Sequence, residues 1–114
     1  MKLTDFPQAI ASLEKHILKI TQTVRAAQAE LDQLIAQIDS TIAHDADLKN
    51  DQQRKAKRAE LMADELYQEC LKELHYQQDN RTVCEIELSL LRNQFTIAKL
   101  EARERVAVLE SVTA

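Results

Sequence analysis

The residues best suited to chemistry in this chain are positive charges gathered near its middle. Five of the 15 basic residues fall within ten positions, and they are Lys49, Arg54, Lys55, Lys57 and Arg58. Amino and guanidinium groups at this density bind phosphates, so the cluster is a candidate nucleic-acid contact. No aromatic residue interleaves for base stacking, Asp51 and Lys55 have the i,i+4 spacing of a helical ion pair, and the formal net charge is −4. We therefore favour a solvated helix face and keep nucleic acid as the alternative.

The three histidines are the candidate metal ligands. An antiparallel hairpin turning near Ala46 would bring His16 and His75 to similar heights, with Glu14 and Glu73 nearby. The Glu-x-x-His spacing of di-iron bundles occurs nowhere in the chain. We interpret all three histidines, including His44, as surface or boundary residues and expect no metal site.

The two cysteines show no sign of reactivity. Cys70 and Cys84 share one heptad register, and local spacing places no histidine beside either of them. They are interpreted as small buried hydrophobic residues. The chain also lacks glycine, which excludes a phosphate-binding loop. No catalytic residue and no cofactor are therefore expected.

Composition indicates the fold class. In 114 residues there are no glycines, one proline and four aromatic residues, whereas strong helix formers dominate. Sheets need turns, and turns favour glycine and proline, so we predict an all-α protein. The opening residues are polar rather than those of a signal peptide, and no charge-free run approaches the roughly 18 residues of a membrane span. With no CxxC pair, these features favour a cytoplasmic protein.

The N-terminal part has the most regular pattern. Thr4 or Asp5 can cap a helix in which Pro7 occupies the first turn. Apolar residues then follow at spacings of four and three: Phe6, Ile10, Leu13, Ile17, Ile20, Val24, Ala27, Leu31, Leu34 and Ile38, ending at Thr41. This strict seven-residue period predicts supercoiling against partner helices.

Two polar stretches are the candidate breaks. Residues 43–50 lose the apolar period, and Asn50 with Gln53 has the spacing of a capping box. Residues 77–82 form the second candidate, because Thr82 and Glu85 have the same spacing at a possible new start. These breaks predict helices at about 5–43, 50–78 and 82–112. The expected fold is a single domain over 1–114, an antiparallel three-helix up-down-up coiled-coil bundle.

One pattern favours a different topology. An unbroken heptad register crosses the second candidate break, through Cys70, Leu74, Gln77, Arg81, Cys84 and Leu88. A continuous helix from about Asn50 to Val112 would preserve this register. The alternative fold is therefore a long two-helix hairpin with an overhanging second helix.

The C-terminal segment is apolar on two sides. One seam faces the bundle: Cys84, Leu88, Leu91, Phe95, Ala98, Ala102, Leu109 and Val112, with Arg105 its only charged interruption. The other seam lies roughly 150–200° around the helix, at heptad positions c and f. We call it the stripe, and it comprises Val83, Ile86, Leu90, Ile97 and Leu100, with Asn93 filling the gap.

The stripe determines the predicted function. A three-helix bundle leaves positions c and f uncovered, and soluble monomers rarely expose a contiguous apolar patch of several hundred Å². We therefore expect a homo-oligomer, most simply a two-fold dimer in which the stripe packs antiparallel on its own copy. The predicted role is a non-enzymatic protein–protein interaction or scaffold module, and a larger protein is a possible further partner. The alternative role is a nucleic-acid accessory protein that uses residues 49–58.

Overall fold

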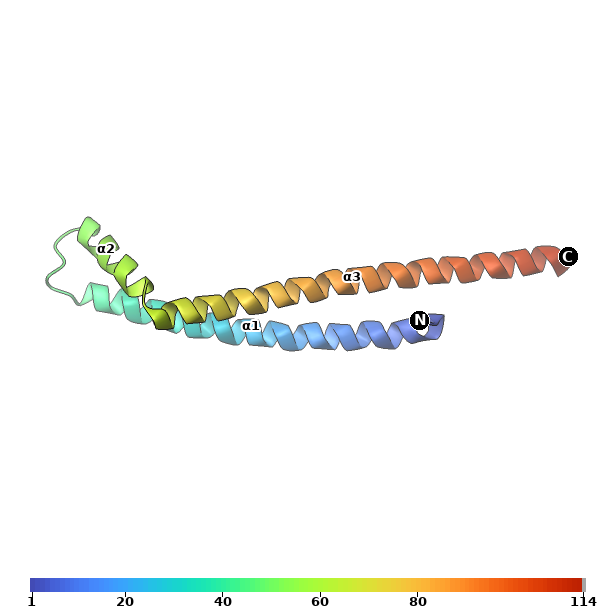
Figure 1. Ribbon diagram of the computed structural model, residues 1–114, viewed down its shortest axis with the longest axis horizontal. Coiled ribbons are helices and arrows are strands. Elements are labelled where there is room, and N and C mark those ends of the chain that lie inside the picture. The colour runs from blue at the N-terminus through green and yellow to red at the C-terminus, as the bar shows by residue number, and fades with distance from the viewer. Residues whose placement is uncertain (114) are drawn as a thin grey trace. The chain divides into compact units, whose positions relative to one another are not determined.

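The computed structural model describes residues 1–113, and these residues are almost entirely helical. A short 3₁₀ helix, Leu3–Asp5, precedes α1 (Phe6–Ala43), α2 (Asp51–Met62) and α3 (Glu65–Thr113). The described residues contain no β-strand (Figure 1). The predicted all-α class is therefore confirmed.

The chain divides into two compact units. Unit 1 combines Met1–Lys19 with the part of the chain that begins at Arg81, and unit 2 comprises Ile20–Asn80. Both long helices therefore contribute to both units. The expected single domain over 1–114 stays a prediction.

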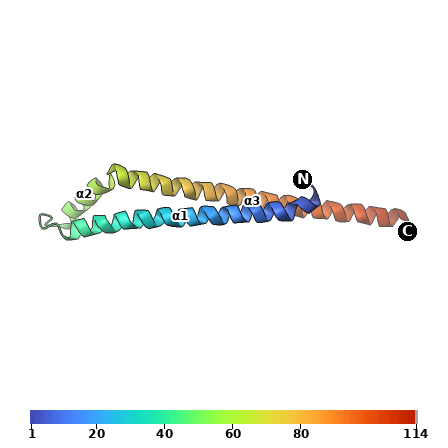
Figure 2. The same cartoon turned by 90° about the horizontal axis from the view of Figure 1, so that it is seen from below.

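In unit 1, the beginning of α1 packs beside the C-terminal part of α3. The two helical segments run in opposite directions and lie side by side in both Figure 1 and Figure 2. The rings of Phe6 and Phe95 stack with centroids 5.3 Å apart, and Arg92 Nη2 lies 3.6 Å from Glu14 Oε1. Phe6 is buried together with Cys84 and Leu88, all of which belong to the predicted seams.

Asp5, one of the two predicted caps of α1, bonds within the 3₁₀ turn that precedes this helix. The backbone N–H of Lys2 donates to the Asp5 carboxylate at 2.9 Å within the 3₁₀ turn. Pro7 occupies the first turn of α1, where its missing N–H would have no intrahelical acceptor. The sequence-based start of this helix is confirmed to within one residue.

Unit 2 is built around the middle of the α1 seam. Its buried residues are Ile20, Val24, Ala27, Leu31, Ile38 and Leu74. The first five lie on the predicted 4-3 seam of α1, whereas α2 contributes no buried residue. The polar helix α2 instead bonds to α1 through an ion pair between Arg58 and Asp39. Apolar packing in this unit therefore comes mainly from α1 and the first turns of α3.

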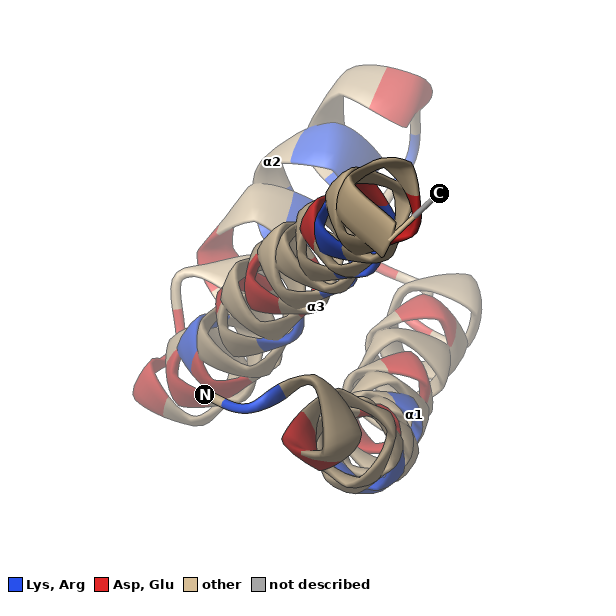
Figure 3. Cartoon of the chain, turned by 90° about the vertical axis from the view of Figure 1, so that its right-hand side faces the viewer, with Lys and Arg blue, Asp and Glu red and all other residues tan. Residues whose placement is uncertain are grey.

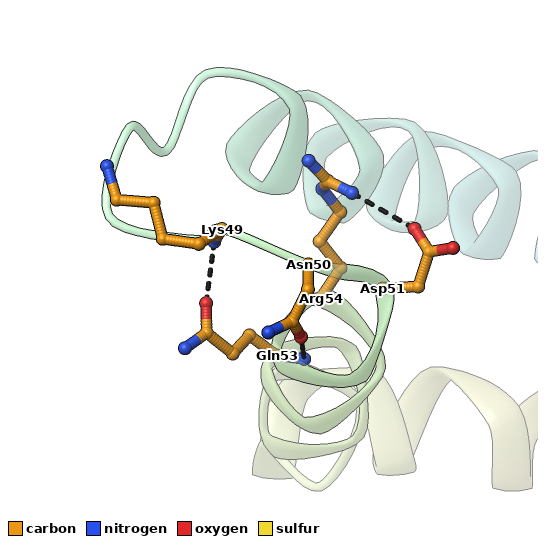
Figure 4. Close-up of polar contacts among 5 residues, drawn as sticks. All are labelled: Lys49, Asn50, Asp51, Gln53 and Arg54. Carbon is orange, nitrogen blue, oxygen red and sulfur yellow. Dashed lines mark hydrogen bonds and ion pairs between the residues drawn. The ribbon is translucent and has the colours of Figure 1, made fainter.

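The start of α2 confirms the predicted cap at Asn50. The Asn50 side-chain oxygen accepts a hydrogen bond from the backbone N–H of Gln53 at 2.9 Å (Figure 4). The Gln53 side chain reaches back one residue further than in a standard capping box, because its Oε1 accepts from the backbone N–H of Lys49 at 2.6 Å. Two N–H groups are thus satisfied at this helix entry.

The predicted break at residues 77–82 is wrong. Helix α3 runs without interruption from Glu65 to Thr113, so Thr82 lies inside a helix rather than at a cap. Arg81 and Glu85 form an i,i+4 ion pair at 3.6 Å across this region. The unbroken heptad register explains the continuity, because one helix keeps the whole seam on one face. Interrupting it would leave up to four N–H and four C=O groups in need of new partners.

The true break lies at Ala63 and Asp64, which neither sequence-based topology predicted. Helix α2 ends at Met62, so helices spanning 50–78 or 50–112 are both wrong in this region. The Asp64 carboxylate accepts from the backbone N–H of Leu66 at 3.1 Å and thereby caps the start of α3. The Gln68 side chain donates to the Met62 carbonyl at 2.7 Å and satisfies the end of α2.

The seam from Cys84 to Val112 was expected to face the bundle along its whole length, but its C-terminal end is exposed. Burial along this seam decreases from Leu88, which is 9% exposed, to a half-buried Ala102. Beyond that residue every position from 103 to 113 is exposed, including Leu109 and Val112. The expectation of a covered seam is therefore wrong over the last turns of α3.

Candidate interaction surfaces on α3

The stripe is exposed along its whole length. The exposed fractions are 52% for Val83, 64% for Ile86, 57% for Leu90, 55% for Ile97 and 53% for Leu100. Their immediate neighbours Cys84 and Leu88, on the opposite seam of the same helix, are only 6% and 9% exposed. The structure thus places all five predicted residues on one exposed face.

The continuity of α3 makes this surface a single element. Residues 83 to 100 belong to one uninterrupted helix, so the stripe is about 25 Å long at a rise of 1.5 Å per residue. Asn93, also exposed, is the one polar residue at these positions. Because the stripe has no titratable or nucleophilic side chain, it can bind an apolar surface but offers no group for catalysis.

Charges near the stripe are of both signs. Glu87, Glu101 and Arg103 are exposed on the same helix and lie beside the apolar positions in the heptad. Figure 3 shows acidic and basic segments interspersed along α3 rather than collected at one end. The surface therefore has an apolar centre and a mixed polar rim, which is the usual anatomy of a protein–protein interface.

The basic residues of 49–58 are largely engaged within the protein. Arg54 bonds to Asp51 at 3.0 Å, Lys57 lies 3.6 Å from Glu60, and Arg58 pairs with Asp39. Lys49 donates its side-chain N–H to the Ala46 carbonyl at 2.9 Å. Acidic and basic segments accompany each other on α2 in Figure 3. Carboxylates therefore already balance much of the charge that would attract phosphate.

One detail of this cluster differs from the prediction. Asp51 forms its ion pair with Arg54, at i,i+3, rather than with Lys55 at i,i+4. Arg54, Lys55 and Arg58 line a shallow cavity of about 180 Å³ together with Ile42 and Asp51. The acidic side chain in this lining reduces its attraction for an anion.

The histidines do not assemble into a site. His16 and His75 are exposed, and His44 Nδ1 lies 2.8 Å from the Ser40 carbonyl oxygen within its own helical turn. Over residues 1–113, no group of three or more histidine, cysteine, aspartate or glutamate side chains is placed to hold a metal ion. Cys84 is buried, Cys70 is half-buried, and both are free thiols.

Sequence reasoning missed a cavity at the α2–α3 break. It measures about 220 Å³ and is lined by Leu34, Gln37, Ile38, Thr41, Leu61, Asp64, Leu66 and Tyr67. The only carboxylate in this lining, that of Asp64, already accepts the capping hydrogen bond from Leu66. The cavity is thus a packing gap beside the break. An aspartate followed by an acidic first turn, Asp64-Glu65, was the signal that could have located it.

Comparison of the chain with protein families, curated proteins and solved structures found no match. Among the described residues, no helix combines the length and the apolar character that crossing a membrane requires. The stripe on α3 is a candidate interaction surface because all five of its residues are more than half exposed.

Proposed function

We propose that this protein is a non-enzymatic helical interaction module that associates with a second copy of itself through the stripe on α3. One observation carries the proposal: Val83, Ile86, Leu90, Ile97 and Leu100 are each more than half exposed on a single helix face. A second copy presents the same apolar surface, so a two-fold contact covers both stripes at once.

The energetics favour a dimer of moderate affinity. Full burial of a leucine, isoleucine or valine side chain contributes about 1.5–3 kcal/mol, so covering the exposed half of one contributes roughly 1 kcal/mol. Ten such side chains, five from each copy, supply on the order of 10 kcal/mol before the cost of association, which is about 4–15 kcal/mol. We therefore expect micromolar or weaker self-association rather than a permanent complex.

Paired substitutions test the stripe directly. Leu90→Glu with Ile97→Glu places two carboxylates in the contact and should reduce the molar mass measured by light scattering to that of a monomer. A matched control replaces Leu18 and Leu66 with glutamate in the same way. These two leucines are 54% and 56% exposed but lie outside the stripe. The control should keep the wild-type mass, and circular dichroism should show both variants to be helical. Equal masses for wild type and the stripe variant would overturn the proposal.

Three further predictions stay with this proposal. The seven-residue period of the α1 and α3 seams supports coiled-coil packing between them, and the opposite directions of these two helices support a hairpin rather than an up-down-up order of three helices. A cytoplasmic location is supported by two cysteines without a CxxC motif. Larger proteins remain candidate occupants of the stripe if the chain does not associate with itself.

The nucleic-acid alternative has less support than the stripe. Three of its five cations, Arg54, Lys57 and Arg58, already pair with carboxylates. A salt-dependent mobility-shift assay with DNA and RNA tests it, and binding at near-physiological salt that is lost on charge reversal of these residues would favour it over the proposed function.

A further inference from the structure

The face of α3 that carries the stripe has one polar residue near its middle, Asn93. Along this face, heptad positions c and f alternate and are all exposed: Val83, Ile86, Leu90, Asn93, Ile97 and Leu100. Any surface that covers the stripe therefore also covers the Asn93 amide. A buried amide without a hydrogen-bonding partner lowers affinity by on the order of tenfold or more. The occupant of the stripe that fits best presents a polar group at the level of Asn93.

A second copy supplies that group in one orientation. When two identical helices pack parallel and in register, each residue faces its own copy across the two-fold axis, so Asn93 lies opposite Asn93. An amide carries both donors and an acceptor, so two amides can bond to each other. The five apolar residues of the stripe then also face their own copies and are covered together.

An antiparallel contact leaves the same amide without a partner. Reversing one helix exchanges the spacings of three and four, so position c of one copy faces position f of the other. Asn93 then lies opposite Val83, Leu90 or Ile97 in the registers that keep the stripe on itself. The antiparallel contact expected from the sequence pattern alone therefore buries an unpaired Asn93 amide on each copy.

The charges that flank the stripe favour the parallel orientation as well. The exposed residues at position g on one flank are Glu87, Gln94 and Glu101, and those at position b on the other flank are Thr82, Ser89, Thr96 and Arg103. In a parallel pair the acidic flank of each copy lies along the neutral and basic flank of the other, whereas an antiparallel pair places each flank along itself. The antiparallel pair therefore brings the glutamates of both copies onto one side.

The carboxylates at the two ends of the stripe do not distinguish the orientations. Asp79 and Glu104 occupy the next f and c positions, and both are exposed. A parallel pair places each of them opposite itself, and an antiparallel pair centred on the stripe places Asp79 opposite Glu104 twice. Two like-charge pairs arise in both cases, at ends of the contact where solvent and salt screen them. The orientation is therefore decided by Asn93 and the flanks.

We infer that the stripe packs parallel and in register on the stripe of a second copy, with Asn93 hydrogen-bonded to Asn93 across the two-fold axis. This orientation rests on the self-association proposed above and adds to it the direction of the partner helix. In such a pair the C-terminal ends of the two α3 helices lie at the same end of the contact.

Single cysteines at the two ends of the stripe test the direction. In a Cys70→Ala/Cys84→Ala background, Val83→Cys chains and Leu100→Cys chains should each form a disulfide-linked dimer alone under mild oxidation. Positions 83 and 100 are about 25 Å apart along one helix at 1.5 Å per residue, so an equimolar mixture of the two chains should give few mixed dimers. An antiparallel pair brings position 83 opposite position 100 and gives mixed dimers only. Because the two chains differ in mass, intact mass spectrometry distinguishes the products.

Asn93→Leu in the same two chains tests the amide. No amide is then left unpaired in the antiparallel pair, so mixed dimers should become roughly fivefold or more abundant relative to like dimers. Circular dichroism checks that each variant stays helical. A share of mixed dimers that Asn93→Leu leaves unchanged would refute the role of Asn93.

Light scattering separates failure of the direction from failure of the proposed function. Mixed dimers in excess over like dimers, in chains that keep Asn93, would overturn the parallel direction, while a dimeric wild-type mass would leave self-association through the stripe intact. A monomeric wild-type mass at every concentration, with no disulfide in any sample, would overturn both.

Discussion

Leu88 and Leu90 lie two positions apart on α3 and provide a direct comparison of its two faces. Leu88 is 9% exposed and Leu90 is 57% exposed. Leu88→Ala removes a buried side chain and leaves a space beside α1, so we expect it to lower the free energy of unfolding by about 2–3 kcal/mol, the low end for buried leucines. Leu90→Ala removes a side chain that is less than half buried, and we expect a loss of roughly 1 kcal/mol or less in the monomer.

Urea denaturation and thermal denaturation, each followed by circular dichroism, measure both changes in the free energy of unfolding. At low protein concentration, Leu88→Ala should lower the transition midpoint clearly, and it should lower the melting temperature by roughly 8–12 °C. The loss in free energy of unfolding caused by Leu90→Ala should grow as the protein concentration rises, because the dimer stabilises the folded chain by mass action. Equal destabilisation by the two variants at low concentration would refute the assignment of buried and exposed faces.

Three other predictions concern the polar contacts around α2. Asn50→Ala removes the cap of α2 and should cost about 1 kcal/mol, seen as faster amide hydrogen exchange in that helix and not in α3. Asp64→Ala should have a similar effect on the first turn of α3, and Asp64→Asn, which retains a capping oxygen, should not. Arg58→Glu replaces the ion pair with Asp39 by a repulsion and should cost at most about 1 kcal/mol, a loss that high salt reduces. Lys55→Glu is its control on the same helix, and equal costs for these two variants would count against the contact between α2 and α1.

The sequence was most informative where apolar spacing was strict. The uninterrupted 4-3 pattern predicted which face of α1 is buried, because a seven-residue period leaves one direction for the core. The same reasoning located the stripe, since Leu90 and Ile97 fall on the side opposite Leu88 and Phe95. These features depend only on helical periodicity, which can be read from the residues without tertiary information.

The breaks between helices were harder to predict, because local and long-range signals disagreed. Thr82 and Glu85 have capping-box spacing, yet the continuous seam on either side favours an unbroken helix. Asp64, which does cap a helix, follows Leu61, Met62 and Ala63, and the polar segment before these three residues has no clear apolar period. A single capping hydrogen bond contributes only about 1 kcal/mol to helix stability. At Thr82 the continuous seam outweighs that contribution, so the helix is not interrupted. At Asp64 no continuous seam opposes the cap, so a new helix starts there.

The exposure of residues 103–113 could not be predicted from periodicity. Leu109 and Val112 follow the same seam as buried Leu88, and nothing in their spacing distinguishes them. The difference arises because α1 begins beside Phe95, which is a tertiary relationship established by the stacking of Phe6. Sequence patterns therefore identify which residues of α3 can be covered by another helix. Where α1 begins determines which of them are covered.

The most direct test of the proposed function is the molar mass of the wild-type chain. One chain has a mass of 13.0 kDa. Size exclusion coupled to light scattering at tens of micromolar should give a mass that rises with concentration toward at least that of a dimer. The Leu90→Glu/Ile97→Glu variant should stay lower at each concentration. A wild-type mass of 13.0 kDa at every concentration would contradict self-association and make the stripe a docking site for a different protein.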